Sequence, residues 1–336
     1  MSEVIDRNLA LELARVTEAA ALTSARWMGR GDKEAADQAA VDAMRYVLGS
    51  VEMDGVVVIG EGAKDEAPML YIGERVGQGV EPKVDIAVDP VEGTRLVAMG
   101  MPNAISVVAL ADQGSMFSCE DISYMEKIAV GKEAAGAIDL DHSPTTNLTQ
   151  IAEAKGMQVQ DLTVVVLDRP RHDELVREIR DAGARIKLIP DGDVAGAMMA
   201  TMPGTGIDVL MGIGGAPEAV IAAAAMTCLG GEMQARLWPR NDLERHLIAE
   251  KNIDVSRIFT VTDLVGGDNV FFSATGITDG ELLQGVHYSS GGATSQTLVM
   301  RSRSGTVRRI EATHRLEKLQ AISAIRYDER VERPAR

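Results

Sequence analysis

Hydrophobic residues recur every three or four positions near the start of the chain, at Leu9, Leu13, Val16 and Ala20. This spacing is typical of an amphipathic α-helix, and we predict one over residues 8–28. The glycines of the segment 29–32 end it, because glycine readily adopts the backbone conformations found after a helix. A second amphipathic helix is predicted to follow directly.

The second helix carries a carboxylate on its apolar face. Asp37 is followed by apolar residues three, four, seven and eleven positions later, so all of them share one face of the helix. A buried carboxylate is unfavourable unless it meets a cation or a hydrogen-bond donor. The pattern leaves two interpretations of equal weight: Asp37 belongs to a site, or it reaches solvent from the edge of the helix.

Two predicted strands end in acidic residues. The strand over residues 55–62 delivers Glu61 between two glycines, where a ligand can approach closely, although an acidic residue in an ordinary turn is the alternative interpretation. The strand that starts at residue 84 ends at Asp89. Pro90 is expected to stop it, and a glycine at 93 permits a tight turn that folds Glu92 and Thr94 back beside Asp89. Such a cluster of hard oxygen ligands suits Mg²⁺ or Mn²⁺.

From residue 162 onward, apolar strands alternate with helices. This repetition is typical of a doubly wound sheet of mostly parallel strands, whose ligands lie at the carboxyl ends of the strands. The loops 168–173, 190–193 and 212–218 occupy that edge. The predicted strands of this part are 162–167, 185–189 and 207–213, and the helices are 173–182, 194–202 and 217–229. Elsewhere we predict strands at 103–111, 124–130 and 269–274 and a hairpin-like segment over 293–310.

Composition narrows the possible partners. The 336 residues, 46% of them hydrophobic, can bury a sizeable core, and 50 acidic against 34 basic residues give a formal net charge of -16. That charge argues against nucleic acid or an anionic membrane as the partner. Cys119 and Cys228 imply no disulfide framework, and the chain shows no secretory signal or membrane span, so we expect a cytoplasmic protein. Asn147-Leu148-Thr149 matches a glycosylation pattern by chance.

Several familiar mechanisms are excluded because their residues are missing. Gly212-Ile213-Gly214 follows a predicted strand, but Pro217 occupies the place of the third glycine of a dinucleotide fingerprint. The sequence also lacks a phosphate-loop lysine motif, a serine elbow, a paired-histidine zinc helix and a paired-cysteine site. The five histidines show no ligand spacing. The chemistry must come from other residues.

What remains is a set of acidic residues accompanied by arginines. Carboxylates that hold divalent ions can clamp a phosphate, lower the pKa of a bound water and stabilise a leaving alkoxide, which is phosphomonoester hydrolysis by in-line attack. Arg169, Arg171 and the amides of residues 191–193 could bind a second phosphate of the same substrate. The acidic candidates are Asp37, Glu61, Asp89, Glu92 and Glu218.

The run Asp89-Pro90-Val91-Glu92-Gly93-Thr94 resembles the signature of the lithium-sensitive, metal-dependent sugar phosphatases, where the fourth position is usually Asp. The Glu92 variant and six further motifs resemble the class II fructose-1,6-bisphosphatases of bacteria. The resemblance runs from Leu9 to about Arg309. The six motifs are Gly29-Arg30-Gly31-Asp32-Lys33, Ile59-Gly60-Glu61-Gly62, Asp65-Glu66-Ala67-Pro68-Met69-Leu70-Tyr71-Ile72-Gly73-Glu74, Arg169-Pro170-Arg171-His172-Asp173, Pro190-Asp191-Gly192-Asp193 and Gly212-Ile213-Gly214-Gly215-Ala216-Pro217-Glu218.

The resemblance implies an α/β fold, namely the layered α/β/α/β/α sugar-phosphatase fold with two domains and the active site between them. An N-terminal α+β metal-binding domain would cover residues 1–145, and a C-terminal α/β substrate-binding domain would cover 146–325. The family also implies dependence on Mn²⁺ or Mg²⁺ and hydrolysis of D-fructose 1,6-bisphosphate to fructose 6-phosphate and phosphate in gluconeogenesis. A homodimer or homotetramer would be the assembly.

Site residues follow from the resemblance, position by position. The metal ligands would be Asp37, Glu61, Asp89, Glu92 and Glu218. The substrate contacts would be Glu92, Gly93, Thr94, Tyr124, Arg169, Pro170, Arg171, Asp191, Gly192, Asp193 and Gly215. Thr94 and Glu61 would be catalytic, with Thr94 orienting or deprotonating the attacking water. Without the resemblance, Tyr124 would be interpreted as a core aromatic of its strand.

Two rival functions stay open at this point. The first is the same mechanism on another sugar phosphate, such as sedoheptulose 1,7-bisphosphate or an inositol phosphate. The second is a noncatalytic sugar-phosphate sensor that keeps the fold. A sensor has no need of Thr94 beside acidic metal ligands, so an intact set argues against it.

Overall fold

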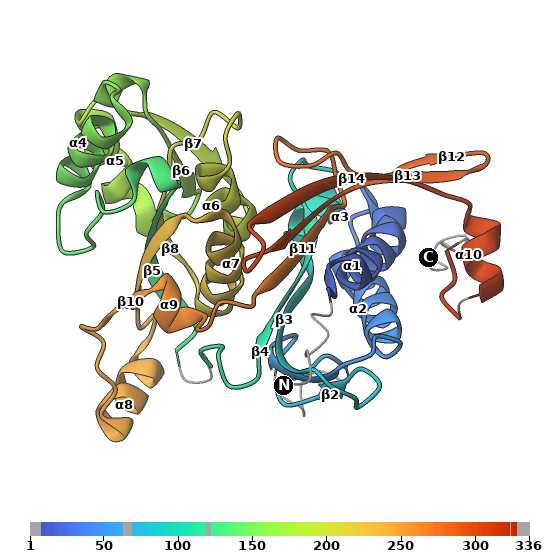
Figure 1. Cartoon of the computed structure of the whole chain (residues 1–336). Helices are drawn as coiled ribbons and strands as arrows, with labels where there is room; N and C mark the ends of the chain where they lie inside the picture. Colours follow the sequence, from blue (N-terminus) through green and yellow to red (C-terminus); the bar gives the residue numbers. More distant parts are fainter. Residues whose placement is uncertain (1–7, 63–68, 119–121, 323, 328–336) are drawn as a thin grey trace.

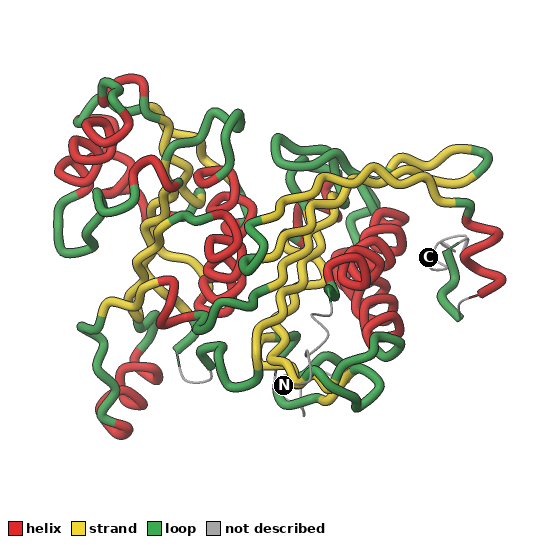
Figure 2. Tube along the Cα trace, viewed as in Figure 1, coloured by secondary structure: helices red, strands yellow, loops and turns green. Residues whose placement is uncertain are grey.

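Two mixed β-sheets alternate with three layers of helices, which gives the order α/β/α/β/α (Figure 1). The computed structural model describes residues 8–62, 69–118, 122–322 and 324–327. Figure 2 shows the two groups of strands with helices between them. The expectation of a layered α/β fold is confirmed. Asp65, Glu66 and Cys119 lie outside the described residues.

The first sheet has the strand order β12-β13-β11-β4-β3-β1-β2, with β14 paired to the other edge of β13. Its strands come from both ends of the chain. They are β1 (Asp54–Ile59), β2 (Arg75–Val76), β3 (Lys83–Glu92), β4 (Ile105–Asp112), β11 (Phe271–Gly276), β12 (His287–Ser289), β13 (Gly292–Arg301) and β14 (Thr306–His314). Helices α1 (Ala10–Ser24) and α2 (Lys33–Leu48) cover its outer face. The predicted apolar face of α1 is buried there, but the helix ends at Ser24 and continues only as a short 3-10 turn.

The second sheet has the order β10-β9-β5-β8-β6-β7. Only β6 is parallel to its neighbours β7 and β8, so the prediction of mostly parallel strands is wrong. The βα repetition accounts for those three strands, whereas β9 returns beside β5 after a helix and pairs with it in the antiparallel sense. The strands are β5 (Tyr124–Val130), β6 (Thr163–Leu167), β7 (Arg185–Ile189), β8 (Val209–Gly215), β9 (Glu232–Leu237) and β10 (Ile258–Thr260).

The strands do not divide at residue 145. β5 precedes that position yet belongs to the second sheet, and β11 to β14 follow it yet complete the first. The chain therefore crosses between the sheets twice. The boundary between residues 145 and 146 stays a prediction about domains, and it does not coincide with the boundary between the sheets.

Helices α6 (Asp193–Thr201) and α7 (Ala216–Leu229) form the middle layer between the sheets. Alanine dominates α7, and its residues are buried on every side because a sheet covers each face. Small side chains let the two sheets approach the helix closely. This layer carries the largest apolar core, so the loops at its amino-terminal ends are held by both sheets. The other helices are α3 (Thr94–Met99), α4 (Pro144–Lys155), α5 (Asp173–Asp181), α8 (Asp242–Lys251), α9 (Val261–Leu264) and α10 (Leu316–Ile322).

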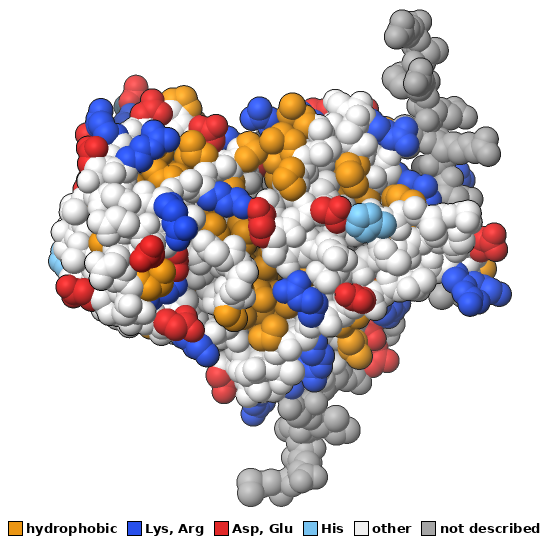
Figure 3. Space-filling view, turned by 90° about the horizontal axis from the view of Figure 1, so that it is seen from above, with side chains coloured by type: hydrophobic (Ala, Val, Ile, Leu, Met, Phe, Trp, Pro, Cys, Tyr) orange, Lys and Arg blue, Asp and Glu red, His pale blue; other side chains and the backbone are white. Residues whose placement is uncertain are grey.

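The surface charge is mixed on the face seen from above (Figure 3). Acidic and basic side chains are interspersed there, and hydrophobic side chains gather in a band between the two halves. The formal net charge of -16 is therefore not concentrated on this face. Among the residues that the structure describes, no helix is both long and apolar enough to cross a lipid bilayer.

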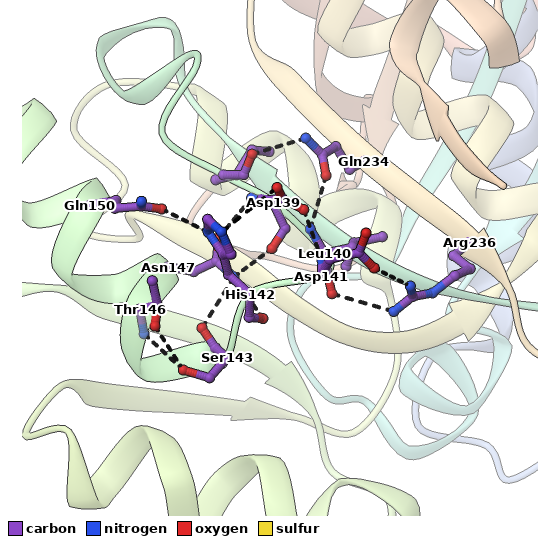
Figure 4. Close-up of polar contacts among 11 residues, drawn as sticks. Asp139, Leu140, Asp141, His142, Ser143, Thr146, Asn147, Gln150, Gln234 and Arg236 are labelled. Carbon is purple, nitrogen blue, oxygen red and sulfur yellow. Dashed lines mark hydrogen bonds and ion pairs between the residues drawn. The ribbon is translucent and has the colours of Figure 1, made fainter. Parts of the chain in front are cut away.

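The Asn147 amide holds the loop before α4 in place (Figure 4). Its Nδ2 donates to the carbonyls of Asp139, His142 and Ser143 at 2.8, 3.3 and 3.3 Å, and its Oδ1 accepts the Asp139 N–H at 2.8 Å. The residue is only 3% exposed. A side chain so enclosed is not offered to a glycosylating enzyme, which agrees with the glycosylation match being accidental.

Replacing Asn147 with alanine is expected to lower the free energy of unfolding by about 1–3 kcal/mol, because the loop loses the hydrogen bonds of this side chain and the N–H of Asp139 loses its acceptor. Urea unfolding of the variant measures this loss. Gln150→Ala is the matched control: its contact with His142 is exposed, and the change should stay within about 0.5 kcal/mol. Equal stability of the Asn147 variant and the native protein would contradict the assignment.

Candidate active site

The carboxyl ends of β1 and β3 bring two of the predicted ligands together. The strands are parallel, and Ile59 on β1 is paired with Ala87 on β3. Glu61 and Asp89 each come two residues later, so the two carboxylates reach the same edge of the sheet. Asp37 approaches from α2, which covers this sheet, and it lines the same cavity. Of the two interpretations of Asp37, the structure therefore favours the site.

Glu92 reaches the cavity through a bulge in β3. The prediction that Pro90 stops the strand is wrong: β3 continues to Glu92, and its pairing with β4 shifts between Asp89 and Glu92. One extra residue on β3 absorbs the proline, which cannot donate to the ladder. Oδ1 of Asp89 accepts the Val91 N–H at 3.0 Å and so fixes the bulge.

The tight turn predicted at Gly93 is confirmed. Gly93 has φ +93°, and a Cβ there would lie 2.8 Å from Cδ1 of Leu96, so a larger residue would be both strained and crowded. The chain then enters α3, whose first residue is Thr94. Thr94 is half-buried and lines the same cavity as the carboxylates.

Glu218 comes from the middle layer, on the first turn of α7, which directly follows β8 of the second sheet. Gly215, the residue before that helix, has no side chain, and a Cβ there would lie 1.7 Å from Oε2 of Glu218. The glycine thus provides the space that the carboxylate occupies. Oε2 of Glu218 is buried and makes no hydrogen bond with any of the described residues.

These side chains line one cavity of about 360 Å³. That volume falls within the usual range for small-molecule sites. Its polar wall contains all five predicted metal ligands together with Gly93, Thr94 and Asp191. The lining residues are Asp37, Ile59, Gly60, Glu61, Val88, Asp89, Val91, Glu92, Gly93, Thr94, Asp191, Pro217, Glu218 and Ile221.

The carboxylates in the cavity resist ionisation. Burial raises the pKa of Glu61 to about 8, of Glu218 to about 7 and of Asp37 to about 6. Repulsion by Asp89 adds to each of these shifts. The pKa of Glu92 is raised well above its ordinary value, first by burial and then by the charge of Asp89. A positive charge in the cavity would favour the ionised form of these groups, and no lysine or arginine is among the described residues that line it.

A hard divalent cation fits this donor set. The candidate ligands are all oxygen, one buried oxygen of Glu218 has no partner among the described residues, and the carboxylates repel one another. No three acidic, histidine or cysteine side chains within residues 8–62, 69–118, 122–322 and 324–327 already form a closed metal-binding group.

The apparent affinity for Mn²⁺ is expected to rise with pH between about 6 and 8. Below the raised pKa values the carboxyl groups of Asp37, Glu218 and Glu61 hold protons that a metal must displace, and above them they are free. We expect a gain of at least about tenfold. Calorimetric titration in buffers of different ionisation enthalpy measures both the affinity and the protons released. A pH-independent affinity without proton release would contradict this assignment.

A second cavity, of about 260 Å³, adjoins the first and shares Glu92, Asp191, Pro217 and Glu218 with it. Its other walls carry basic residues. The further lining residues are Ser123, Tyr124, Leu167, Arg169, Arg171, Gly192, Asp193, Gly214, Gly215 and Arg240. Pro170 is not among the residues lining either cavity, and it begins the short helical turn that carries Arg171.

Backbone contacts fix the two arginines. Arg171 donates to the Ile213 carbonyl at 2.7 and 3.1 Å, and Arg169 donates to the Pro190 carbonyl at 2.6 Å. The guanidinium of Arg171 also lies 5.1 Å from the ring centre of Tyr124. Tyr124 is therefore a wall of the cavity, as the resemblance implies, and the interpretation as a core residue is wrong.

Sequence reasoning missed two cations of this region. Arg240 lines the second cavity and its guanidinium lies 5.8 Å from the Tyr124 ring. It follows β9, which the sequence analysis did not predict; the alternation of polar and apolar residues over 232–237 was the available signal. Lys127 lies behind the cavity on β5 and pairs with Asp193. The carboxylate of Asp193 is thus paired with a lysine.

Known proteins resemble this chain along most of its length. The family model described as "Bacterial fructose-1,6-bisphosphatase, glpX-encoded" matches residues 7–314. "Fructose-1,6-bisphosphatase class 2" of Haemophilus influenzae is 48% identical over 331 residues, covering 95% of this chain and 99% of that protein. "Fructose-1,6-bisphosphatase 1 class 2" of Escherichia coli K12 is 48% identical over 325 residues, covering 93% of this chain and 96% of that protein.

Proposed function

Because the chain belongs to the glpX-encoded family of bacterial fructose-1,6-bisphosphatases and hydrolyses D-fructose 1,6-bisphosphate, we propose that its two adjoining cavities hold the two phosphates of one substrate molecule. The contrast between the cavities is the observation that carries this proposal. One is walled by carboxylates and suits a metal-bound phosphate, while the other presents arginines. The reaction yields fructose 6-phosphate, so the phosphate on C1 lies among the carboxylates and that on C6 beside the arginines.

The enzyme is a metal-dependent phosphatase, and we propose Mn²⁺ or Mg²⁺ as its metal. The ligands would be Asp37, Glu61, Asp89, Glu92 and Glu218, which share one cavity. When bound, the ions neutralise the phosphate, lower the pKa of the attacking water and stabilise the leaving alkoxide.

Thr94 and Glu61 act on the attacking water in this proposal. Thr94, the first residue of α3, lines the carboxylate cavity, and its hydroxyl could relay a proton at Oγ1. Glu61 lines the same cavity, and with the metal bound its carboxylate would orient the attacking water or accept its proton. Gly93 fixes Thr94 through the turn that only glycine accommodates.

The sugar and its second phosphate are bound by the loops of the second sheet. Arg169 and Arg171 are held by backbone carbonyls, so little side-chain freedom is lost on binding. Gly192, with φ +89°, turns the chain into α6, and Gly192 and Asp193 line the second cavity, where their backbone amides would bind a phosphate. Tyr124 and Gly215 complete its wall, and Asp191 lies between the two cavities.

Family membership identifies a phosphatase and excludes the sugar-phosphate sensor. The reaction belongs to gluconeogenesis. We further propose a cytoplasmic homodimer or homotetramer, with residues 1–145 supplying most metal ligands and residues 146–325 the arginines. Glu218 is the proposed metal ligand that lies beyond this division, and the proposed substrate contacts that precede it are Glu92, Gly93, Thr94 and Tyr124.

Phosphate release from a panel of substrates tests the proposed division of the site. We expect kcat/KM to be highest for fructose 1,6-bisphosphate, with sedoheptulose 1,7-bisphosphate turned over because it carries phosphates at both ends. Inositol monophosphate lacks the second phosphate and should be poor. Replacing Arg171 with alanine should then raise KM for the bisphosphates and leave the monophosphate rate unchanged. An equal effect on both substrate classes would contradict the arginine site.

A further inference from the structure

A lysine is buried behind two residues of the second cavity, Asp193 and Gly215, and it lines neither that cavity nor the carboxylate cavity. Lys127 is on β5 and is 3% exposed. Alternate side chains of a strand point the same way, so Lys127 faces the side of its neighbours Met125 and Ala129, which belong to the core around α6 and α7. A lysine in an apolar layer is unfavourable unless its charge is paired. Its partners therefore indicate why it is there.

The ammonium of Lys127 connects two segments of the site. It forms an ion pair with Asp193 at the start of α6 and donates a hydrogen bond of 2.9 Å to the carbonyl of Gly215 at the end of β8. The backbone leaves space for this pair: a Cβ at Gly214 would lie 1.9 Å from Oδ2 of Asp193 and 2.9 Å from Nζ of Lys127. Glycine at 214 is thus required by the ion pair itself.

Both segments carry a proposed metal ligand or its support. The residue after Asp193, Val194, donates its N–H to Oε1 of Glu92 at 2.9 Å. Gly215 packs directly against the carboxylate of Glu218. Lys127 therefore joins the backbone that supports Glu92 to the backbone that supports Glu218.

The charge of Lys127 also affects the pKa of Glu218. Burial is the main reason for the raised pKa of Glu92 and Glu218, and the negative charge of Asp193 raises the pKa of both further. The ammonium of Lys127 lowers the pKa of Glu218 and so opposes Asp193. The positive charge of Lys127 therefore partly cancels the effect of the Asp193 charge on Glu218.

We propose that Lys127 is a positioning residue of the metal site: by holding Asp193 and Gly215, it keeps Glu92 and Glu218 at the separation that a divalent ion requires. The inference rests on the proposed ligand set. If Lys127 acted only through its charge, removing it would tighten the binding of Mn²⁺, because a cation near the carboxylates would be lost. If Lys127 positions the ligands, removing it weakens the binding of Mn²⁺.

The test uses calorimetric titration of Mn²⁺ into the metal-free enzyme without substrate. The double variant Lys127→Met, Asp193→Asn removes both charges, so the net charge is unchanged and no buried charge is left unpaired. We expect it to bind Mn²⁺ about tenfold more weakly than the native enzyme, or worse. The matched control is Lys155→Met, Asp208→Asn, which removes another largely buried lysine–aspartate pair, at the opposite end of β6 and β8. It should lower the melting temperature and leave the Mn²⁺ affinity unchanged.

Three outcomes would overturn the role of Lys127: native Mn²⁺ affinity in the double variant, equal weakening in the control, or tighter binding in the single variant Lys127→Met. If the double variant does not fold, the Mn²⁺ affinity of Lys127→Met alone tests the positioning role. Glu218→Gln separates this failure from that of the proposed function. If Glu218→Gln binds Mn²⁺ like the native enzyme, the ligand set is wrong; if it loses binding while the Lys127 variants do not, only the positioning role is wrong.

Discussion

Replacing Thr94 with alanine is expected to lower kcat by roughly 100-fold or more while leaving Mn²⁺ affinity largely intact. The hydroxyl is the one uncharged proton-transfer group that we place beside the attacking water, and positioned groups of this kind contribute factors of about 10² to 10⁴. Its loss should not disturb folding, because Thr94 is half-buried at the start of a short helix and Gly93 sets the turn before it.

Thr94→Ser is the matched control for this prediction. Serine keeps the hydroxyl and loses only a methyl group, so most of the activity should be retained. Steady-state kinetics at saturating Mn²⁺, with calorimetry of metal binding, distinguishes a catalytic defect from a metal defect. An alanine variant with nearly native kcat would remove Thr94 from the mechanism.

Replacing Glu218 with alanine or glutamine is expected to weaken Mn²⁺ binding by roughly 100-fold or more, since even groups that only support a metal ligand contribute about 10- to 100-fold. The titration of activity against Mn²⁺ should shift to higher concentration accordingly. Glu153→Gln, an exposed glutamate on the outer helix α4, is the control and should leave the titration in place.

Glu218→Gln should also stabilise the metal-free protein at alkaline pH. The pKa of Glu218 is raised from 4.5 to about 7, so its ionisation destabilises the fold as pH rises from about 4.5 to 7 and the penalty is complete above that range. Glu218→Gln removes a destabilisation on the order of 1 to 3 kcal/mol at pH 8 and none at pH 4. Melting curves of the metal-free proteins at both pH values measure it. A loss of stability at pH 8, or an unshifted Mn²⁺ titration, would count against Glu218 as a ligand.

The sequence was most informative where chemistry interrupts a regular pattern. Glu61 and Asp89 stand at points where an apolar strand stops, and their meeting at one sheet edge follows from strand periodicity alone. The role of Asp37 stayed open because the helix pattern shows which residues share a face of α2 but not what that face packs against. Tyr124 and Gly215 were identified only through the resemblance, since nothing local distinguishes them from an ordinary strand aromatic and an ordinary loop glycine.

The features that were predicted wrongly or not at all also depend on contacts with residues distant in sequence. Pro90 does not end β3 because a bulge absorbs it, and the bulge depends on the neighbouring strand β4. The direction of β5 and β9 cannot be read from periodicity, which is identical in parallel and antiparallel strands. Lys127 follows Glu126 in a strand, so one of the two must face inward, and only Asp193, distant in sequence, determines which one.

A crystal structure of the enzyme with Mn²⁺ and the product fructose 6-phosphate would test the central claim most directly, because anomalous scattering locates manganese without assumptions about the ligands. We predict manganese bound by carboxylates from the set Asp37, Glu61, Asp89, Glu92 and Glu218, with the phosphate of the product on Arg169 and Arg171. Manganese outside the carboxylate cavity, or a product phosphate held away from both arginines, would contradict the account.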